Sequence, residues 1–149
     1  MQSLIALSFQ LAVLTLSDAS AQSMVEGCMA YAAENELTVA VAVVDRKTDL
    51  AAYRRMDRLR AGPAKLAMEK ADYAARWGSP TQNLRKSVND GSLAWALGSR
   101  GVPVGGGVPV YGKDGDLLGA IGVSGASQEQ DIACAEAGIA KAGLKATRP

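Results

Sequence analysis

Residues 39–44 constrain the fold of this chain more than any other segment, because all six are apolar. A strand with apolar side chains on both faces fits only in the middle of a sheet that is covered on two sides. A polar turn at residues 45–49 and a second strand pattern at residues 50–56 follow directly. The segment is therefore predicted to form half of an antiparallel hairpin with helices above and below it.

A second hairpin is predicted nearer the C-terminus. Residues 105–111 and 117–125 flank Lys113-Asp114-Gly115-Asp116, a sequence typical of a hairpin turn. Pro109 cannot donate a ladder hydrogen bond, so the first of these strands is expected at a sheet edge or a bulge.

Helix signals surround both hairpins. The first predicted helix is capped at Ser17 and ends near Asn35, and the second extends from Gly62-Pro63 to Gly78. Two short helices are predicted over 81–88 and 92–97. The last helix is predicted to start at Ser127, which has the capping-box spacing to Gln130. This order predicts an α+β fold, an α-β-α sandwich with a central antiparallel sheet. A length of 149 residues suits a single domain, residues 1–149.

The first residues allow two interpretations. Residues 4–16 are mostly apolar and precede Ala19-Ser20-Ala21, as in a signal peptide, yet the first basic residue is Arg46. Because a signal peptide needs a basic region before its apolar run, we favour a short first strand followed by the helix capped at Ser17. Residues 1–13 are then a flexible or signal-like segment, and the predicted location is cytoplasmic, with export left open.

Composition excludes several classes of function. A net charge of +1 lacks the basic surplus of a nucleic-acid-binding surface, and aromatic residues are only 5% of the chain. The apolar run is too short to span a bilayer, so no membrane partner is expected. Histidine is absent, which excludes histidine-ligated haem and the commonest general base, and no metal site is predicted. Cys28 and Cys134 are expected to be buried apolar residues, with a disulfide unsupported.

Lys70 is the residue that most directly suggests a functional site. It lies four positions after Leu66 and three before Tyr73, on the stripe that also includes Ala74 and Trp77 and is predicted to face inward. Such a lysine either buries its stem and reaches water with its amine, or holds an anionic group, or acts as a nucleophile if burial lowers its pKa.

Each of the other candidate residues also has both a structural and a functional interpretation. Gly105, Gly106 and Gly107 either form a tight bend or let a ligand touch the main chain. Asp131, in the first turn of the last helix, either compensates the helix dipole or serves as a polar contact or base. The remaining candidates are Arg55, as an anion contact or a solvated strand end, and Thr81, as a helix cap or a ligand hydroxyl.

Several short motifs occur in a fixed order along most of the chain. They are Val43-Val44-Asp45, Arg55-Met56-Asp57, Lys70-Ala71, Pro80-Thr81, Gly106-Gly107 with Pro109, Gly119-Ala120-Ile121-Gly122-Val123-Ser124-Gly125, and Gln130-Asp131. In combination they resemble the GlcG/HbpS family, which includes the C-terminal domain of PduO-type proteins. The resemblance implies a profilin-like or roadblock-like fold and homo-oligomers. It also implies a bacterial catabolic gene cluster and, in some members, haem binding.

These observations lead to two main hypotheses of function. The first is a small-molecule-binding protein whose anionic ligand, haem or another tetrapyrrole among the candidates, contacts Arg55, Lys70, Thr81, Gly105, Gly106, Gly107, Gln130 and Asp131. The second is a catabolic enzyme (an isomerase, tautomerase or lyase) that acts on a small oxo- or hydroxy-acid through Lys70 and Asp131. An assembly protein whose glycine-rich strand packs subunits together is a third interpretation.

Overall fold

A computed structural model describes residues 15–92 and 101–149 of the chain. Its elements are α1 (Asp18–Glu34), β1 (Ala40–Asp45), β2 (Leu50–Arg55), α2 (Ala61–Trp77), α3 (Thr81–Asn89), β3 (Gly107–Tyr111), β4 (Leu117–Ser124) and α4 (Gln128–Lys141). The predicted order of helices and hairpins is confirmed for these residues. The small helix predicted over 92–97 falls almost entirely outside them.

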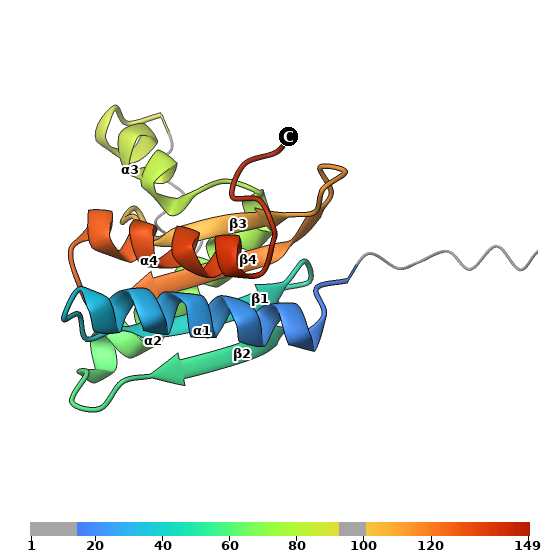
Figure 1. Cartoon of the computed structure of the whole chain (residues 1–149). Coiled ribbons are helices and arrows are strands. Elements are labelled where there is room, and N and C mark those ends of the chain that lie inside the picture. The colour runs from blue at the N-terminus through green and yellow to red at the C-terminus, as the bar shows by residue number, and fades with distance from the viewer. Residues whose placement is uncertain (1–14, 93–100) are drawn as a thin grey trace, which may run out of the picture.

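The strands form one antiparallel sheet in the order β2-β1-β4-β3. Figure 1 shows α1 and α4 side by side over one face of this sheet and α2 over the other. The predicted α-β-α sandwich is therefore confirmed, with β1, which is apolar up to Asp45, at an interior position. Pro109 lies on the edge strand β3, as predicted, and the chain near Lys145 pairs with the end of that strand.

The two sides of the sheet are packed differently. The side under α1 and α4 holds larger side chains such as Met24, Ile121 and Ile139. The side under α2 is almost entirely small: Ala40, Ala42, Ala120, Ala64, Ala67, Ala71 and Ala74. Because these residues have little side chain, the backbone of α2 lies close against β1 and β4.

Helix α1 begins where the sequence predicted. The prediction of a short strand before it is wrong for the residues that the structure describes there. Thr15 and Leu16 have no strand structure. The Ser17 hydroxyl oxygen accepts a hydrogen bond from the Ser20 backbone N–H at 3.1 Å, and Ala21 is fully buried. Ala19-Ser20-Ala21 therefore lies in the first turn of α1.

The prediction that Trp77 faces inward is wrong. It occupies the last position of α2, directly before the left-handed Gly78 that ends the helix, and is 54% exposed. The last turn of α2 therefore leaves the indole partly uncovered.

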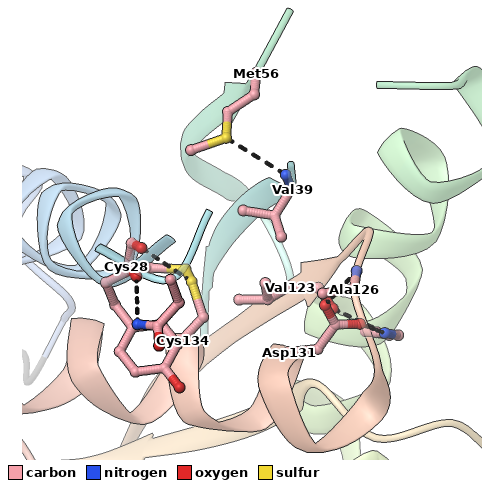
Figure 2. The surroundings of a disulfide bond; sticks show 10 residues. Cys28, Val39, Met56, Val123, Ala126, Asp131 and Cys134 are labelled. Atoms are coloured by element: carbon pink, nitrogen blue, oxygen red, sulfur yellow. Dashed lines mark hydrogen bonds and ion pairs between the residues drawn. A yellow bond between two sulfur atoms is a disulfide. The ribbon is translucent and has the colours of Figure 1, made fainter. Parts of the chain in front are cut away.

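A disulfide between Cys28 and Cys134 joins α1 to α4, with the two Cα atoms 4.6 Å apart (Figure 2). The predicted burial of both cysteines is confirmed, whereas the pairing was not predicted from the sequence. Gly27 and Gly138 let the two helices approach closely, since an added Cβ on either would collide with the other helix. No helix among the described residues is long and apolar enough to cross a membrane.

The disulfide is expected to stabilise the fold strongly because it closes a loop between residues 106 positions apart. Chain-entropy arguments give about 5 kcal/mol for a loop of this length. Urea denaturation with and without a thiol reductant should show a loss of that size in the free energy of unfolding. The Cys28→Ala/Cys134→Ala variant should show no response to the reductant. Equal stability of the oxidised and reduced wild type would contradict the expectation.

The close approach of α2 to the sheet should make Gly122 intolerant of a side chain. An added Cβ would lie 2.5 Å from the Ala71 backbone nitrogen and would also collide with the Ala67 carbonyl oxygen. Gly122→Ala should therefore lower the free energy of unfolding by about 1–3 kcal/mol. Gly62→Ala is the matched control, because nothing lies within 4 Å of its added Cβ, and it should be neutral or stabilise by up to about 1 kcal/mol. Equal effects of the two substitutions in urea denaturation would contradict the packing argument.

Candidate functional site

Lys70 and Asp131 meet in the interior, although they come from helices on opposite faces of the sheet. The Lys70 Nζ lies 2.9 Å from the Asp131 Oδ2 and donates a second hydrogen bond, 2.8 Å long, to the carbonyl oxygen of Val123 in β4. Lys70 is 1% exposed and Asp131 is 2% exposed. The structure thus brings the two predicted acid/base candidates together as a buried ion pair.

The start of α4 determines where the Asp131 carboxylate points. Ser127 and Gln130 form a capping box, which anchors the first turn. The Asp131 Oδ1 accepts the Ala126 backbone N–H at 3.1 Å, while its Oδ2 faces Lys70 (Figure 2 labels Asp131, Ala126 and Val123). Both carboxylate oxygens are therefore held by donors, and the negative charge lies near the positive end of the helix dipole.

The predicted glycines lie directly against this pair. Gly106 has φ of +117°, and an added Cβ there would be 2.9 Å from both the Lys70 Nζ and the Asp131 Cβ. An added Cβ on Gly107 would be 2.5 Å from the Lys70 carbonyl oxygen. The backbone can cover the ion pair only because these positions lack side chains.

Thr81 of α3 and Gln128 of α4 form hydrogen bonds with the loop that covers the ion pair, residues 104–107. The fully buried Thr81 hydroxyl donates to the Val104 carbonyl oxygen at 2.6 Å and accepts the Gly107 N–H at 3.0 Å. The Gln128 Oε1 accepts the Gly105 N–H at 3.4 Å and an Arg85 guanidinium N–H at 3.1 Å. We call Lys70, Thr81, Gly105, Gly106, Gly107 and Asp131 the Lys70–Asp131 centre.

Two predicted site residues lie outside the centre. Arg55 is an exposed residue at the end of the edge strand β2, and β1 separates that strand from β4. The exposed Gln130 uses its side chain to accept the Ser127 backbone N–H. Conversely, sequence reasoning missed Arg85 and Gln128. Gln128 could have been found from its place one turn before Asp131, but Arg85 depends on how α3 packs.

Burial dominates the electrostatics of the centre. Desolvation lowers the pKa of Lys70, and the nearby Asp131 charge opposes that shift. Desolvation also raises the pKa of Asp131, against the effect of Lys70. Both shifts favour the neutral forms, so moving a proton from the ammonium to the carboxylate costs less here than in water. The pair has the composition of an acid and a base held at hydrogen-bond distance.

The fold is that of a known family. The model of the family described as haem degrading protein HbpS-like matches residues 16–140, and the chain belongs to this family. Protein GlcG of Escherichia coli K12 is 34% identical over 109 residues, which cover 73% of this chain and 81% of GlcG.

Two solved structures resemble the whole domain. The crystal structure of a PduOC:heme complex superposes with a TM-score of 0.82 at 28% identity, covering 89% of this chain and 99% of that one. A double mutant of Streptomyces reticuli HbpS superposes with a TM-score of 0.77 at 28% identity, covering 94% and 88%. The resemblance predicted from the motifs is thus confirmed.

Haem is the group that these relatives imply, and its iron needs an axial donor. The sequence contains no histidine, and Cys28 and Cys134 are joined to each other. The Lys70 amine is already bonded to Asp131 and Val123. The side chains of the Lys70–Asp131 centre therefore do not fit an iron-ligated haem.

Removing one partner of the ion pair should cost far more than removing both. Lys70→Met leaves a buried carboxylate without its cation and should lower the free energy of unfolding by about 3–5 kcal/mol. The Lys70→Met/Asp131→Leu variant should lose at most about half as much, because no unpaired charge remains. Lys65→Met, an exposed lysine of the same helix, should stay within about 0.5 kcal/mol of wild type. Urea denaturation at pH 7 measures all three, and a single variant as stable as the double one would contradict this account.

Proposed function

We propose that the protein binds a small organic acid, an oxo- or hydroxy-acid, at the Lys70–Asp131 centre. The observation that supports this most is the buried ammonium of Lys70. An ammonium has three protons, and the described residues supply acceptors for two of them, Asp131 and Val123. A carboxylate or oxo oxygen of the ligand would accept the third, and the low local dielectric would strengthen this charge-assisted bond.

In this proposal the ligand reaches the Lys70 amine by displacing part of the glycine loop, Gly105 to Gly107, that covers it. Lys70 is 1% exposed, so a ligand has to displace part of the loop above it. The Gly105 N–H reaches Gln128 at 3.4 Å, the longest of the bonds that hold this loop, whereas the Thr81 bonds are 2.6 and 3.0 Å. Gly105 would therefore move more easily than Gly107 and admit the ligand beside Thr81.

A second candidate function is proton transfer on the same ligand. It is favoured by the opposite pKa shifts of Lys70 and Asp131, both of which favour the neutral form. Lys70 would protonate the oxo oxygen while Asp131 accepts a proton from the neighbouring carbon, as in an isomerase or tautomerase. A lyase would instead use the neutral Lys70 amine to form an imine with the oxo carbon, with loss of water.

The test is calorimetric titration of the purified protein with glyoxylate, pyruvate, glycolate and lactate. Wild type and Lys65→Met should bind at least one of these acids saturably. Binding by Lys70→Met/Asp131→Leu should be at least about tenfold weaker, because the buried ammonium is gone. This double variant is used because the single Lys70 variant is expected to be unstable. Borohydride reduction of a bound oxo-acid onto Lys70, read by mass spectrometry, would support the lyase version.

Three results would contradict the proposal. One is the absence of saturable binding of all four acids to folded wild type. Another is a titration with hemin that produces a sharp Soret band saturating at one haem per subunit, which would return the tetrapyrrole hypothesis to first place. The third is equal binding by wild type and the double variant, which would place the ligand elsewhere.

The oligomeric state and the location of the protein stay predictions. Homo-oligomers remain expected from the family resemblance. The cytoplasmic location has evidence against it in the Cys28–Cys134 disulfide, because disulfides persist mainly in oxidising compartments.

A further inference from the structure

A surface hollow lies at the C-terminal end of α2, away from the buried Lys70–Asp131 centre. Two adjoining cavities of about 330 and 320 Å³ share the lining residues Arg76, Leu117 and Arg148. The first is completed by Trp77, Gly78 and Tyr111, and the second by Arg46, Ala75 and Asp116. We call this region the Trp77 cleft. Trp77 follows Lys70 by seven residues, about 10 Å along the helix, so the two sites are distinct.

The Trp77 cleft carries a surplus of positive charge. Among the described lining residues, Arg46, Arg76 and Arg148 are basic and Asp116 alone is acidic. Arg148 uses its Nε to donate to the Gly115 carbonyl oxygen at 3.1 Å, which anchors the side chain. The described residues supply no acceptor for its terminal nitrogens, which can therefore donate to a ligand. Arg76 forms an exposed ion pair with Asp72, a contact of the kind that contributes little to stability and exchanges readily with other anions.

The cleft also offers an aromatic surface. Trp77 is 54% exposed, and its ring centroid lies 6.3 Å from that of Tyr73. The Arg148 guanidinium lies 6.0 Å from the centre of the Tyr111 ring. The Tyr111 hydroxyl donates to the Gly78 carbonyl oxygen at 2.8 Å, which satisfies one of the acceptors at the negative end of α2. An apolar ring face therefore lies beside guanidinium groups.

We propose that the Trp77 cleft binds a planar aromatic carboxylate. The ring of the ligand stacks on the exposed face of Trp77, and its carboxylate accepts hydrogen bonds from Arg76 and Arg148. Guanidinium groups match the two oxygens of a carboxylate in geometry as well as charge. An uncharged aromatic compound would use only the indole, and a small aliphatic acid only the arginines, so the combination selects for a ligand that has both parts.

The experiment is calorimetric titration with 2-naphthoate, and with 2-naphthamide as its uncharged counterpart. Wild type should bind 2-naphthoate saturably with a dissociation constant below about 1 mM and bind the amide at least about tenfold more weakly. Arg76→Gln, Arg148→Gln and Trp77→Ser should each weaken 2-naphthoate binding about five- to tenfold. Arg54→Gln, which removes an exposed arginine from β2, is the matched control and should bind as wild type does.

The Lys70→Met/Asp131→Leu variant separates this proposal from the one above. It should bind 2-naphthoate with unchanged affinity if the ligand lies in the Trp77 cleft. Loss of binding in this variant would place the aromatic acid at the Lys70–Asp131 centre and overturn the inference. Equal affinity for acid and amide, equal losses in Arg54→Gln and Arg148→Gln, or no saturation by 10 mM would each overturn it as well.

Discussion

The buried ion pair of Lys70 and Asp131 is the interaction on which the arrangement of layers depends. It joins α2 and α4, which lie on opposite faces of the sheet, and it also uses the Val123 carbonyl of β4. Burying two charges is costly unless their geometry is good and their remaining atoms are bonded. Here the Ala126 N–H donates a hydrogen bond to the second carboxylate oxygen of Asp131. The ion pair is therefore stable only when α2, β4 and the start of α4 are assembled together.

The unequal packing of the two faces makes this pairing geometrically feasible. Small side chains under α2, such as Ala71 and Ala120, bring that helix close to the sheet, and Gly106 provides the space that the Lys70 amine occupies. On the other face, the Cys28–Cys134 disulfide holds α4 against α1. A wider spacing on either face would separate the ammonium from the carboxylate and leave both charges without a partner.

Local patterns predicted much of this structure from the sequence. The apolar run of β1, the turn before β4 and the capping box of α4 each have a short-range physical cause, and helical spacing alone placed Lys70 inward. The disulfide was not predicted, because its two cysteines are 106 residues apart and nothing local encodes how α1 crosses α4. Trp77 was placed wrongly, since periodicity does not tell where a helix extends past the sheet it covers. Arg55 was grouped with the site by its charge, but strand order separates β2 from β4.

Family membership and ligand identity depend on different residues of this chain. The backbone matches a haem complex with a TM-score of 0.82 at 28% sequence identity. An axial donor to iron, in contrast, is one side chain, and the chain contains no histidine to supply it. The features at the two sites are charges: a buried ammonium beside Asp131, and arginines beside an exposed indole. Both favour an organic anion bound through its oxygens over a group bound through its metal, which is why the proposed ligands differ in chemistry from the haem of the PduOC complex while the fold stays the same.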